Sequence, residues 1–216
     1  LALSDGSHEQ MIIDAIKKQT GHLQIHALGY QEFQNFDYLM FDPTAAFKSI
    51  EGTSHILGFT GRLITAGLIS SDKNSIGGSI FGLDPKTEGS VSSIPEFITD
   101  GAFVSNDDTS GIVLGHVLAK NLEVTLGDEV VILGQGADGS IAAGKYHVKG
   151  LIKSNTPDLD NYTVILPLHV SQSLLTAEGS LSEIAIRLDK NQNVEAVVNE
   201  IKSKLNNDVF EVLTWE

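Results

Sequence analysis

Residues 111–133 have the sequence GIVLGHVLAKNLEVTLGDEVVIL, which is the most informative stretch of the chain. A short helical pattern at 115–122 is followed by an apolar run at 129–133. The glycine-rich segment 134–144 then leads into 145–152, KYHVKGLI, where apolar and polar residues alternate with the period of a strand. The runs on either side of the glycines predict the two arms of a β-hairpin, so we expect this part of the chain to be rich in β-structure.

Three glycines in the connection have the spacing of a dinucleotide-binding turn. Gly134, Gly136 and Gly139 match G-x-G-x-x-G. Such a turn needs a helix directly after the glycines, because the N–H groups at the helix start face the pyrophosphate. Residues 145–152 predict a strand in that place. We therefore interpret the glycines as a hairpin connection and expect the chain to bind no cofactor.

The first part of the chain predicts mixed structure. Residues 8–21 have apolar side chains at helical spacing. Residues 22–30 alternate between apolar and polar side chains, which predicts a strand with one solvent-exposed face that carries His22 and His26. A short helix is expected within 42–52, and a long strand-rich stretch follows.

The last part of the chain has the clearest pattern. Residues 182–188, 193–205 and 208–215 predict a strand, an amphipathic helix and a second strand. A helix that joins two such strands is typical of a right-handed βαβ unit, so we expect the strands to be parallel.

These patterns together predict an α+β fold with a discontinuous domain. We expect a porter-like α/β subdomain formed by both chain ends, residues 1–85 and 177–216. A β-rich, sabre-like subdomain, residues 86–176, is expected to be inserted between them, because short strands there are broken repeatedly by glycine and proline.

The composition excludes several classes of function. The chain has 216 residues, a net charge of −14 and only two arginines, Arg62 and Arg187. Nucleic acid is therefore not an expected partner, because binding to phosphates requires clustered cations. There is no cysteine, which excludes disulfides, thiolate metal sites and cysteine nucleophiles.

Neither a metal site nor a catalytic site is predicted. His22 and His26 lie four residues apart on one strand, about 13 Å, which is too far for one zinc ion. We interpret the seven histidines as surface or strand-face residues. Asp107 with Asp108, and the segment 155–161, are interpreted as solvated turns; a calcium site in the second is the alternative. No serine lies in a G-x-S-x-G elbow, so we predict that the protein is not an enzyme.

The segments around the hairpin resemble a known family more closely than any of these motifs. They are similar to the extracytoplasmic domain of ABC-transporter permeases of the MacB and lipoprotein-releasing (LolC and LolE) type, within the FtsX superfamily. One motif of that family, G-x-x-L-A-x-x-L-x-V-x-x-G-D-x-V, is matched by Gly115, Leu118, Ala119, Leu122, Val124, Gly127, Asp128 and Val130. A second, the strand motif F-x-V-x-G-I, is matched by Tyr146, Val148, Gly150 and Leu151. Further segments agree in order: LSDGSHEQM, GHLQIHALGY, FGLDP and the closing LTWE.

The resemblance implies a two-part domain at the periplasmic face of the bacterial inner membrane, between two membrane spans. It implies a partnership with an ABC ATPase subunit or domain, a dimer with a second permease subunit, and contact with a periplasmic carrier, adaptor or lipoprotein cargo. The expected function is non-catalytic: coupling of cytoplasmic ATP hydrolysis to export or lipoprotein release. The alternative is a stand-alone periplasmic binding or scaffold domain that recognises an envelope protein.

The hairpin connection occupies the place where lipoprotein-releasing permeases can carry an extended hook for the carrier. In this sequence it is short, GQGADGSIAAG, and it has no proline and no arginine. Its candidate partner-binding residues are Gln135, Ala137, Asp138 and Ser140. Because the connection is short, MacB-like export and lipoprotein release both stay open as roles.

Overall fold

The computed structural model describes residues 20–190 and 193–214. The helix predicted at 8–21 lies almost entirely outside the described residues. The described helices are α2 (Tyr30–Phe33), the 3-10 helix η2 (Phe36–Tyr38), α3 (Thr44–Ile50), α4 (Glu88–Val91), the 3-10 helix η3 (Ile94–Phe97), α5 (His116–Leu122), α6 (Pro157–Tyr162), α7 (Leu168–Leu174) and α8 (Val194–Lys204). The strands are β1 (Leu23–Ala27), β2 (Ile56–Ser70), β3 (Ser75–Leu83), β4 (Ile98–Gly101), β5 (Gly111–Gly115), β6 (Glu129–Gln135), β7 (Ile141–Ile152), β8 (Thr163–Pro167), β9 (Glu183–Leu188) and β10 (Phe210–Thr214).

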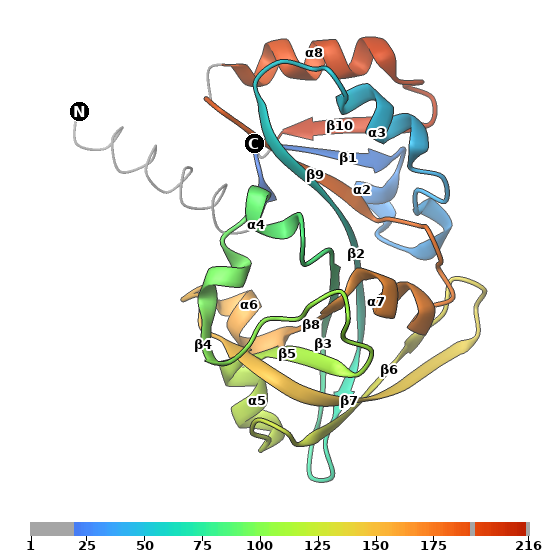
Figure 1. Ribbon diagram of the computed structural model, residues 1–216. Coiled ribbons are helices and arrows are strands. Elements are labelled where there is room, and N and C mark those ends of the chain that lie inside the picture. The colour runs from blue at the N-terminus through green and yellow to red at the C-terminus, as the bar shows by residue number, and fades with distance from the viewer. Residues whose placement is uncertain (1–19, 191–192, 215–216) are drawn as a thin grey trace, which may run out of the picture.

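Strands from both ends of the chain lie together at the top of Figure 1. β1 lies between β10 and β9 and is antiparallel to both. β9 and β10 therefore run parallel, as the sequence predicts, but they are not neighbours in the sheet. The predicted α+β fold, with an α/β part built from both chain ends, is confirmed. We call β1, β9, β10 and the part of β2 that pairs with β9 the open sheet.

The open sheet has its own apolar core. α8 and α3 contribute side chains to it, because the apolar stripe of each helix turns towards the strands. The buried members are Leu23, Ile25, Met40, Ala46, Ile50, Leu181, Ile184, Ile186, Leu188, Val197, Val198, Ile201, Leu205, Phe210 and Val212.

The prediction that β1 has a solvent-exposed face is wrong. His22 and His26 are buried, at 7% and 1% exposed. The Nδ1 atom of His26 lies 2.8 Å from the carbonyl oxygen of Ser182, and its ring stacks on Tyr30 with the ring centroids 5.4 Å apart. The backbone N–H of Leu188 donates a hydrogen bond to Nδ1 of His22. The alternation marked two chemically different faces, but α2 covers the polar one.

The second half of β2 and strands β3, β5, β6, β7 and β8 close into a barrel at the bottom of Figure 1, and β4 pairs with β7 outside the ring. β2 pairs with β3, β3 with β8, β8 with β5, β5 with β7, β7 with β6, and β6 returns to β2. This ring contains both parallel and antiparallel pairs. The sequence predicted a β-rich part but not its closure, because closure depends on the pairing of Leu68–Ser70 with Val131–Leu133 across the whole intervening chain.

The two faces of the barrel wall bury different apolar clusters. In β5, Ile112 and Leu114 belong to one cluster and Val113 to the other. In β8, Val164 and Ile165 divide in the same way. This period of two is what a strand covered on both sides requires. The first cluster also includes Leu118, Ala119 and Leu122 of α5, and the second includes Leu159 of α6.

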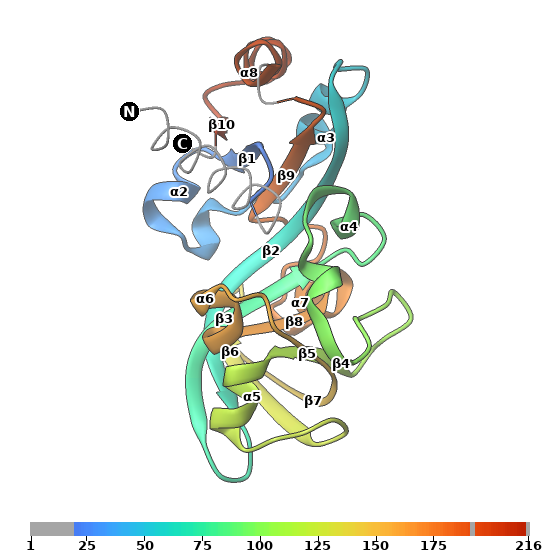
Figure 2. The same ribbon diagram turned by 90° about the vertical axis from the view of Figure 1, so that its left-hand side faces the viewer.

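β2 belongs to both parts of the molecule. Its first half pairs with β9 and its second half with β3 and β6, and Figure 2 shows it running from the upper part to the lower part. The division into residues 1–85 with 177–216 and residues 86–176 stays a prediction. β3 and the second half of β2 precede residue 86 and yet pair within the barrel.

Candidate functional site

The hairpin between β6 and β7 is confirmed. The two strands pair antiparallel from Glu129 opposite His147 to Gln135 opposite Ile141. The turn is closed by two backbone hydrogen bonds, from Gly136 N–H to the Ser140 oxygen at 2.8 Å and from Gly139 N–H to the Gly136 oxygen at 2.9 Å. The segment after the glycines is thus a strand, as the alternation of residues 145–152 predicts.

The turn glycines have structural roles. Gly139 has a φ of +81°, in the left-handed region that side chains disfavour. A Cβ at Gly136 would lie 2.7 Å from Oδ1 of Asp138. The N–H groups of Gly136, Ala137, Gly139 and Ser140 all donate within the protein, so they are not free to hold a phosphate.

Three of the four candidate partner-binding side chains reach solvent. Gln135, Asp138 and Ser140 are exposed, whereas Ala137 is half-buried. The N–H of Ala137 donates to the carbonyl oxygen of Leu175 at 2.7 Å, which ties the loop to the end of α7. Hydrogen bonds from Ser140 lower the pKa of Asp138, which keeps this exposed carboxylate charged.

A neighbouring residue completes this surface. Ile141, the first residue of β7, is 87% exposed, although isoleucine is usually buried. Sequence reasoning missed it, because the strand pattern predicts which residues share a face but not whether the face is covered. We call Gln135, Asp138, Ser140 and Ile141 the hairpin tip.

The interpretation of residues 155–161 as a solvated turn is wrong. These residues form most of α6, and Asp160 is buried. Its carboxylate accepts hydrogen bonds from the N–H and hydroxyl of Ser154, at 2.7 and 2.9 Å, and from the N–H of Asn155 at 3.0 Å. These donors replace water and account for a buried carboxylate without a metal ion.

The other acidic turn is held by a lysine. The Asp108 carboxylate accepts from the N–H and hydroxyl of Ser105, and Nζ of Lys149 lies 2.6 Å away. In the part of the chain that the structure describes, no three His, Asp or Glu side chains come close enough to share a metal ion.

A buried charge cluster lies where the open sheet meets the barrel. Arg62 of β2 is 1% exposed, and its guanidinium faces Glu88 of α4 and Glu183 of β9. Nη1 donates to Glu183 at 2.8 Å, while Nε and Nη2 donate to Glu88 at 3.1 and 2.6 Å. Burial opposes the charged guanidinium, but the charges of Glu88 and Glu183 outweigh it and raise the pKa of Arg62. We call these three residues the Arg62 cluster.

Further hydrogen bonds complete the cluster. The Ser92 hydroxyl donates to the Glu88 carboxylate at 2.5 Å. The Ser182 hydroxyl donates to the Arg62 carbonyl oxygen at 3.0 Å. Sequence reasoning did not single out Arg62. The available signal was one arginine within an otherwise uncharged strand, but its partners lie 26 and 121 positions away in the chain.

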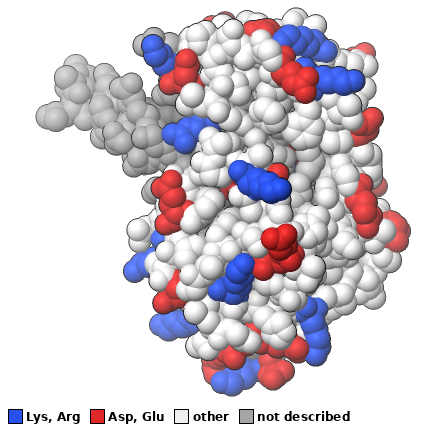
Figure 3. Space-filling view, in the orientation of Figure 1, with Lys and Arg blue, Asp and Glu red and all other residues white. Residues whose placement is uncertain are grey.

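The charged side chains of one face are shown in Figure 3. On the face shown in Figure 3, the Lys and Arg side chains are scattered among acidic and uncharged ones. Such a distribution offers no continuous stripe of cations on that face. Within residues 20–190 and 193–214, none of the helices combines the length and apolarity needed to cross a bilayer.

Similar folds occur in two solved structures. The periplasmic region of MacB from Actinobacillus actinomycetemcomitans superposes with a TM-score of 0.62 at 15% identity, covering 94% of this chain and 91% of that one. The extracellular domain of the noncanonic ABC-type transporter YknZ from Gram-positive bacteria gives a TM-score of 0.58 at 11% identity, covering 79% and 88%. At these identities the likeness establishes the fold.

Comparisons of sequence identify the family to which the chain belongs. An uncharacterized ABC transporter permease of Methanocaldococcus jannaschii is 28% identical over 126 residues, which are 55% of this chain. The matched segment spans only 29% of that relative. Residues 1–204 match the family described as the MacB-like periplasmic core domain. Because this match extends over nearly the whole sequence, the chain belongs to the MacB-like periplasmic core domain family.

Proposed function

We propose that this chain is the non-catalytic, extracytoplasmic domain of an ABC-transporter permease at the periplasmic face of the inner membrane. It couples ATP hydrolysis by a cytoplasmic ATPase subunit or domain to export or lipoprotein release, in a dimer with a second permease subunit. Membership of the MacB-like family and the similarity to an archaeal permease support this proposal.

The observation that carries the proposal is the path of β2. Leu23 in β1 pairs with Thr214 in β10, so the two described ends of the chain lie side by side in the open sheet. β2 leaves this sheet beside β9 and continues without interruption into the barrel. A displacement applied at both ends therefore reaches the barrel through one hydrogen-bonded strand.

The Arg62 cluster stiffens this path at its midpoint. It joins β2 to α4 on one side and to β9 on the other. A bidentate contact between arginine and carboxylate fixes orientation as well as distance. The junction therefore moves as a unit, and the barrel acts as a lever attached to the open sheet.

The test uses the complete permease with its ATPase, reconstituted in lipid nanodiscs. Arg62→Lys keeps the positive charge but removes the two-pronged contact, which loosens the junction. We expect it to lower ATP turnover by the complex severalfold while the isolated ATPase is unaffected. A domain that acts only as a stand-alone scaffold would leave ATP turnover unchanged.

A disulfide provides a rescue. The hydroxyls of Thr60 and Thr87 lie 2.8 Å apart, and they bridge β2 and the segment before α4. Because the chain has no cysteine, the pair Thr60→Cys and Thr87→Cys gives a single defined bond in this domain. We expect oxidation of this pair in the Arg62→Lys background to restore ATP turnover, and a reductant to reverse it. Failure of the formed disulfide to restore turnover would contradict the lever.

The hairpin tip is the proposed contact with a periplasmic carrier, adaptor or lipoprotein cargo, with Ala137 holding the loop in place. Its exposed Ile141 supplies apolar area, and Asp138 supplies a charge that selects a basic partner. A photoreactive residue at Gln135 of the permease in cells should crosslink to that partner. The matched control is position Asp72, at the tip of the β2–β3 hairpin. Equal crosslinking from both positions would contradict this contact.

A further inference from the structure

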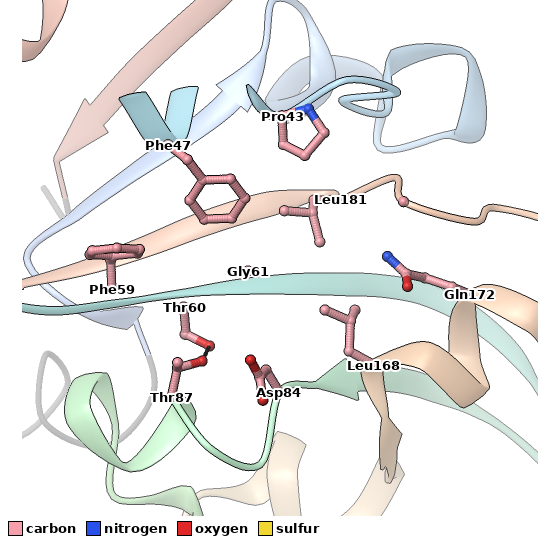
Figure 4. A pocket seen from close by; sticks show the side chains of 11 residues that line it. Pro43, Phe47, Phe59, Thr60, Gly61, Asp84, Thr87, Leu168, Gln172 and Leu181 are labelled. Atoms are coloured by element: carbon pink, nitrogen blue, oxygen red, sulfur yellow. Dashed lines mark hydrogen bonds between the residues drawn. The ribbon is translucent and has the colours of Figure 1, made fainter. Parts of the chain in front are cut away.

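A cavity of about 310 Å³ opens where α3, β2 and α7 meet, beside the Arg62 cluster. Figure 4 shows Phe47 and Phe59 on one side and Leu168 and Leu181 further along. Pro43 completes the apolar wall. The volume is at the lower end of the range of about 300 to 1,000 Å³ that is typical of small-molecule sites.

Strand β2 passes behind the cavity, and its residue at this point is a glycine, which has no side chain to fill the space. Gly61 of β2 lines the cavity, and a Cβ there would lie 2.7 Å from Cδ1 of Leu181. Any larger residue at this position must push the Leu181 side chain aside. The absence of a side chain at Gly61 therefore leaves room for Leu181 and for the cavity.

The polar side chains of the wall are those of Thr60, Asp84, Thr87 and Gln172, and the two threonine hydroxyls bond to each other. Asp84 is the only ionisable residue among the described residues of the lining, and its carboxylate points towards the cavity in Figure 4. One oxygen of Asp84 accepts from the N–H of Lys86 at 3.0 Å, and no described residue donates to the other. The amide nitrogen of Gln172 donates one of its two N–H groups to the Ser180 carbonyl oxygen at 2.9 Å. The Asp84 carboxylate is the one charged acceptor that the described lining offers a ligand.

The aromatic residues add a second attraction for cations. The rings of Phe47 and Phe59 have centroids 5.9 Å apart and are tilted by 48°. Cations bind favourably against the faces of such rings, whereas anions do not. None of the described residues that line the cavity is Lys or Arg, and the chain as a whole has a net charge of −14. Both the local and the overall electrostatic field therefore favour a positive ligand.

We propose that this cavity binds a small amphipathic cation, an alkyl- or arylammonium ion, with its apolar part between Phe47, Phe59 and Leu181. The ammonium group faces the Asp84 carboxylate. This site is separate from the hairpin tip, and it does not depend on the proposed coupling to an ATPase.

The test is calorimetric titration of the 216-residue chain with octyltrimethylammonium, at concentrations below micelle formation. Octyl sulfate and 1-octanol are the matched anionic and neutral probes. We expect the cation to bind at least about tenfold more tightly than either, because only the cation gains from Asp84. Equal binding of all three probes, or no saturable binding of the cation, would overturn the proposal.

Two variants locate the site. Asp84→Asn keeps the acceptor for Lys86 N–H, and we expect it to weaken binding of the cation about five- to tenfold while binding of 1-octanol stays unchanged. Asp100→Asn removes the same charge from an exposed position on β4, and it should leave binding of the cation unchanged. Circular dichroism checks that both variants are folded. If Asp100→Asn weakens binding as much as Asp84→Asn does, the effect is one of net charge and the proposed site is wrong.

Discussion

Arg62 and Glu88 form a two-pronged ion pair, with both side chains at most 1% exposed to solvent. Burying a charge is costly, and the attraction between the partners offsets that cost only when both are present. The pair therefore contributes little net stability compared with an apolar pair, but removing one partner is strongly destabilising. It also fixes how α4 is oriented on β2.

Arg62→Met should lower the free energy of unfolding by about 3–5 kcal/mol, because it leaves Glu88 and Glu183 buried without a cation. Chemical denaturation followed by circular dichroism measures this. Arg187→Met is the control, since Arg187 is half-buried and outside the cluster; we expect a change below about 1 kcal/mol. A similar loss for both variants would contradict a special role of the Arg62 cluster.

Two glycines of the G-x-G-x-x-G motif should respond differently to alanine. Gly139→Ala should cost about 1–2 kcal/mol of stability, because φ at this position is +81°. Gly134→Ala should be nearly neutral, since an added Cβ would meet its nearest neighbour at 3.6 Å, an ordinary contact. Urea denaturation measures both values. Equal sensitivity at the two positions would argue against the hairpin turn as the reason for the glycines.

The closed barrel predicts opposite outcomes for two isoleucines. Ile69 is fully buried in the barrel core, so Ile69→Ala should cost about 2–5 kcal/mol. Ile141 is 87% exposed, so Ile141→Ala should change stability by less than about 0.5 kcal/mol. Thermal and urea unfolding of both variants provide the measurement. A large loss of stability on Ile141→Ala would show that the hairpin tip is packed rather than exposed.

Acid should weaken the contact between Asp108 and Lys149. Burial acts to raise the pKa of Asp108, but hydrogen bonds from Lys149 and Ser105 outweigh it, and the pKa is lowered overall. The stability that this carboxylate contributes is therefore fully present above its unfolded pKa of about 3.9, and it is lost as the pH falls through the folded value.

Asp108→Asn tests this pH dependence. We expect the variant to be about 1 kcal/mol less stable than the parent at about pH 7, and we expect this difference to shrink as the pH is lowered through the folded pKa of Asp108. Urea midpoints across this pH range measure the difference. Asp107→Asn, one residue earlier and exposed, should not change the pH dependence. A constant difference between Asp108→Asn and the parent across this pH range would contradict the assignment.

Local patterns in the sequence predicted most elements of this fold. Three kinds of pattern show which side chains are buried: the alternation in residues 145–152, the apolar stripe on α8, and the apolar runs of β2 and β9. In each case the structure contains the strand or helix that the pattern predicts. The β6–β7 hairpin followed from two such runs that are close in sequence. What these features share is that the pattern of buried side chains can be read along one element or two elements adjacent in sequence, even where the pairing partners of a strand, such as β9, are distant.

Features that depend on distant partners could not be predicted. His26 is polar in an alternating strand, which predicts exposure to solvent, but Tyr30 stacks on its ring and its Nδ1 contacts the distant carbonyl oxygen of Ser182. Arg62 has partners on two other elements, and the cavity beside Phe59 arises only after α3 and α7 meet β2. Each of these depends on the relative placement of elements, which the pattern within one element does not record.

The position of β1 has a consequence for synthesis of the protein. Both strands that flank it, β9 and β10, are made after every other strand of the sheet. β1 thus leaves the ribosome before every other described strand and is among the last to find its neighbours. During that interval its backbone edges and the side chains of Leu23 and Ile25 stay unpaired, which makes this segment the expected site of aggregation or chaperone binding in the nascent chain.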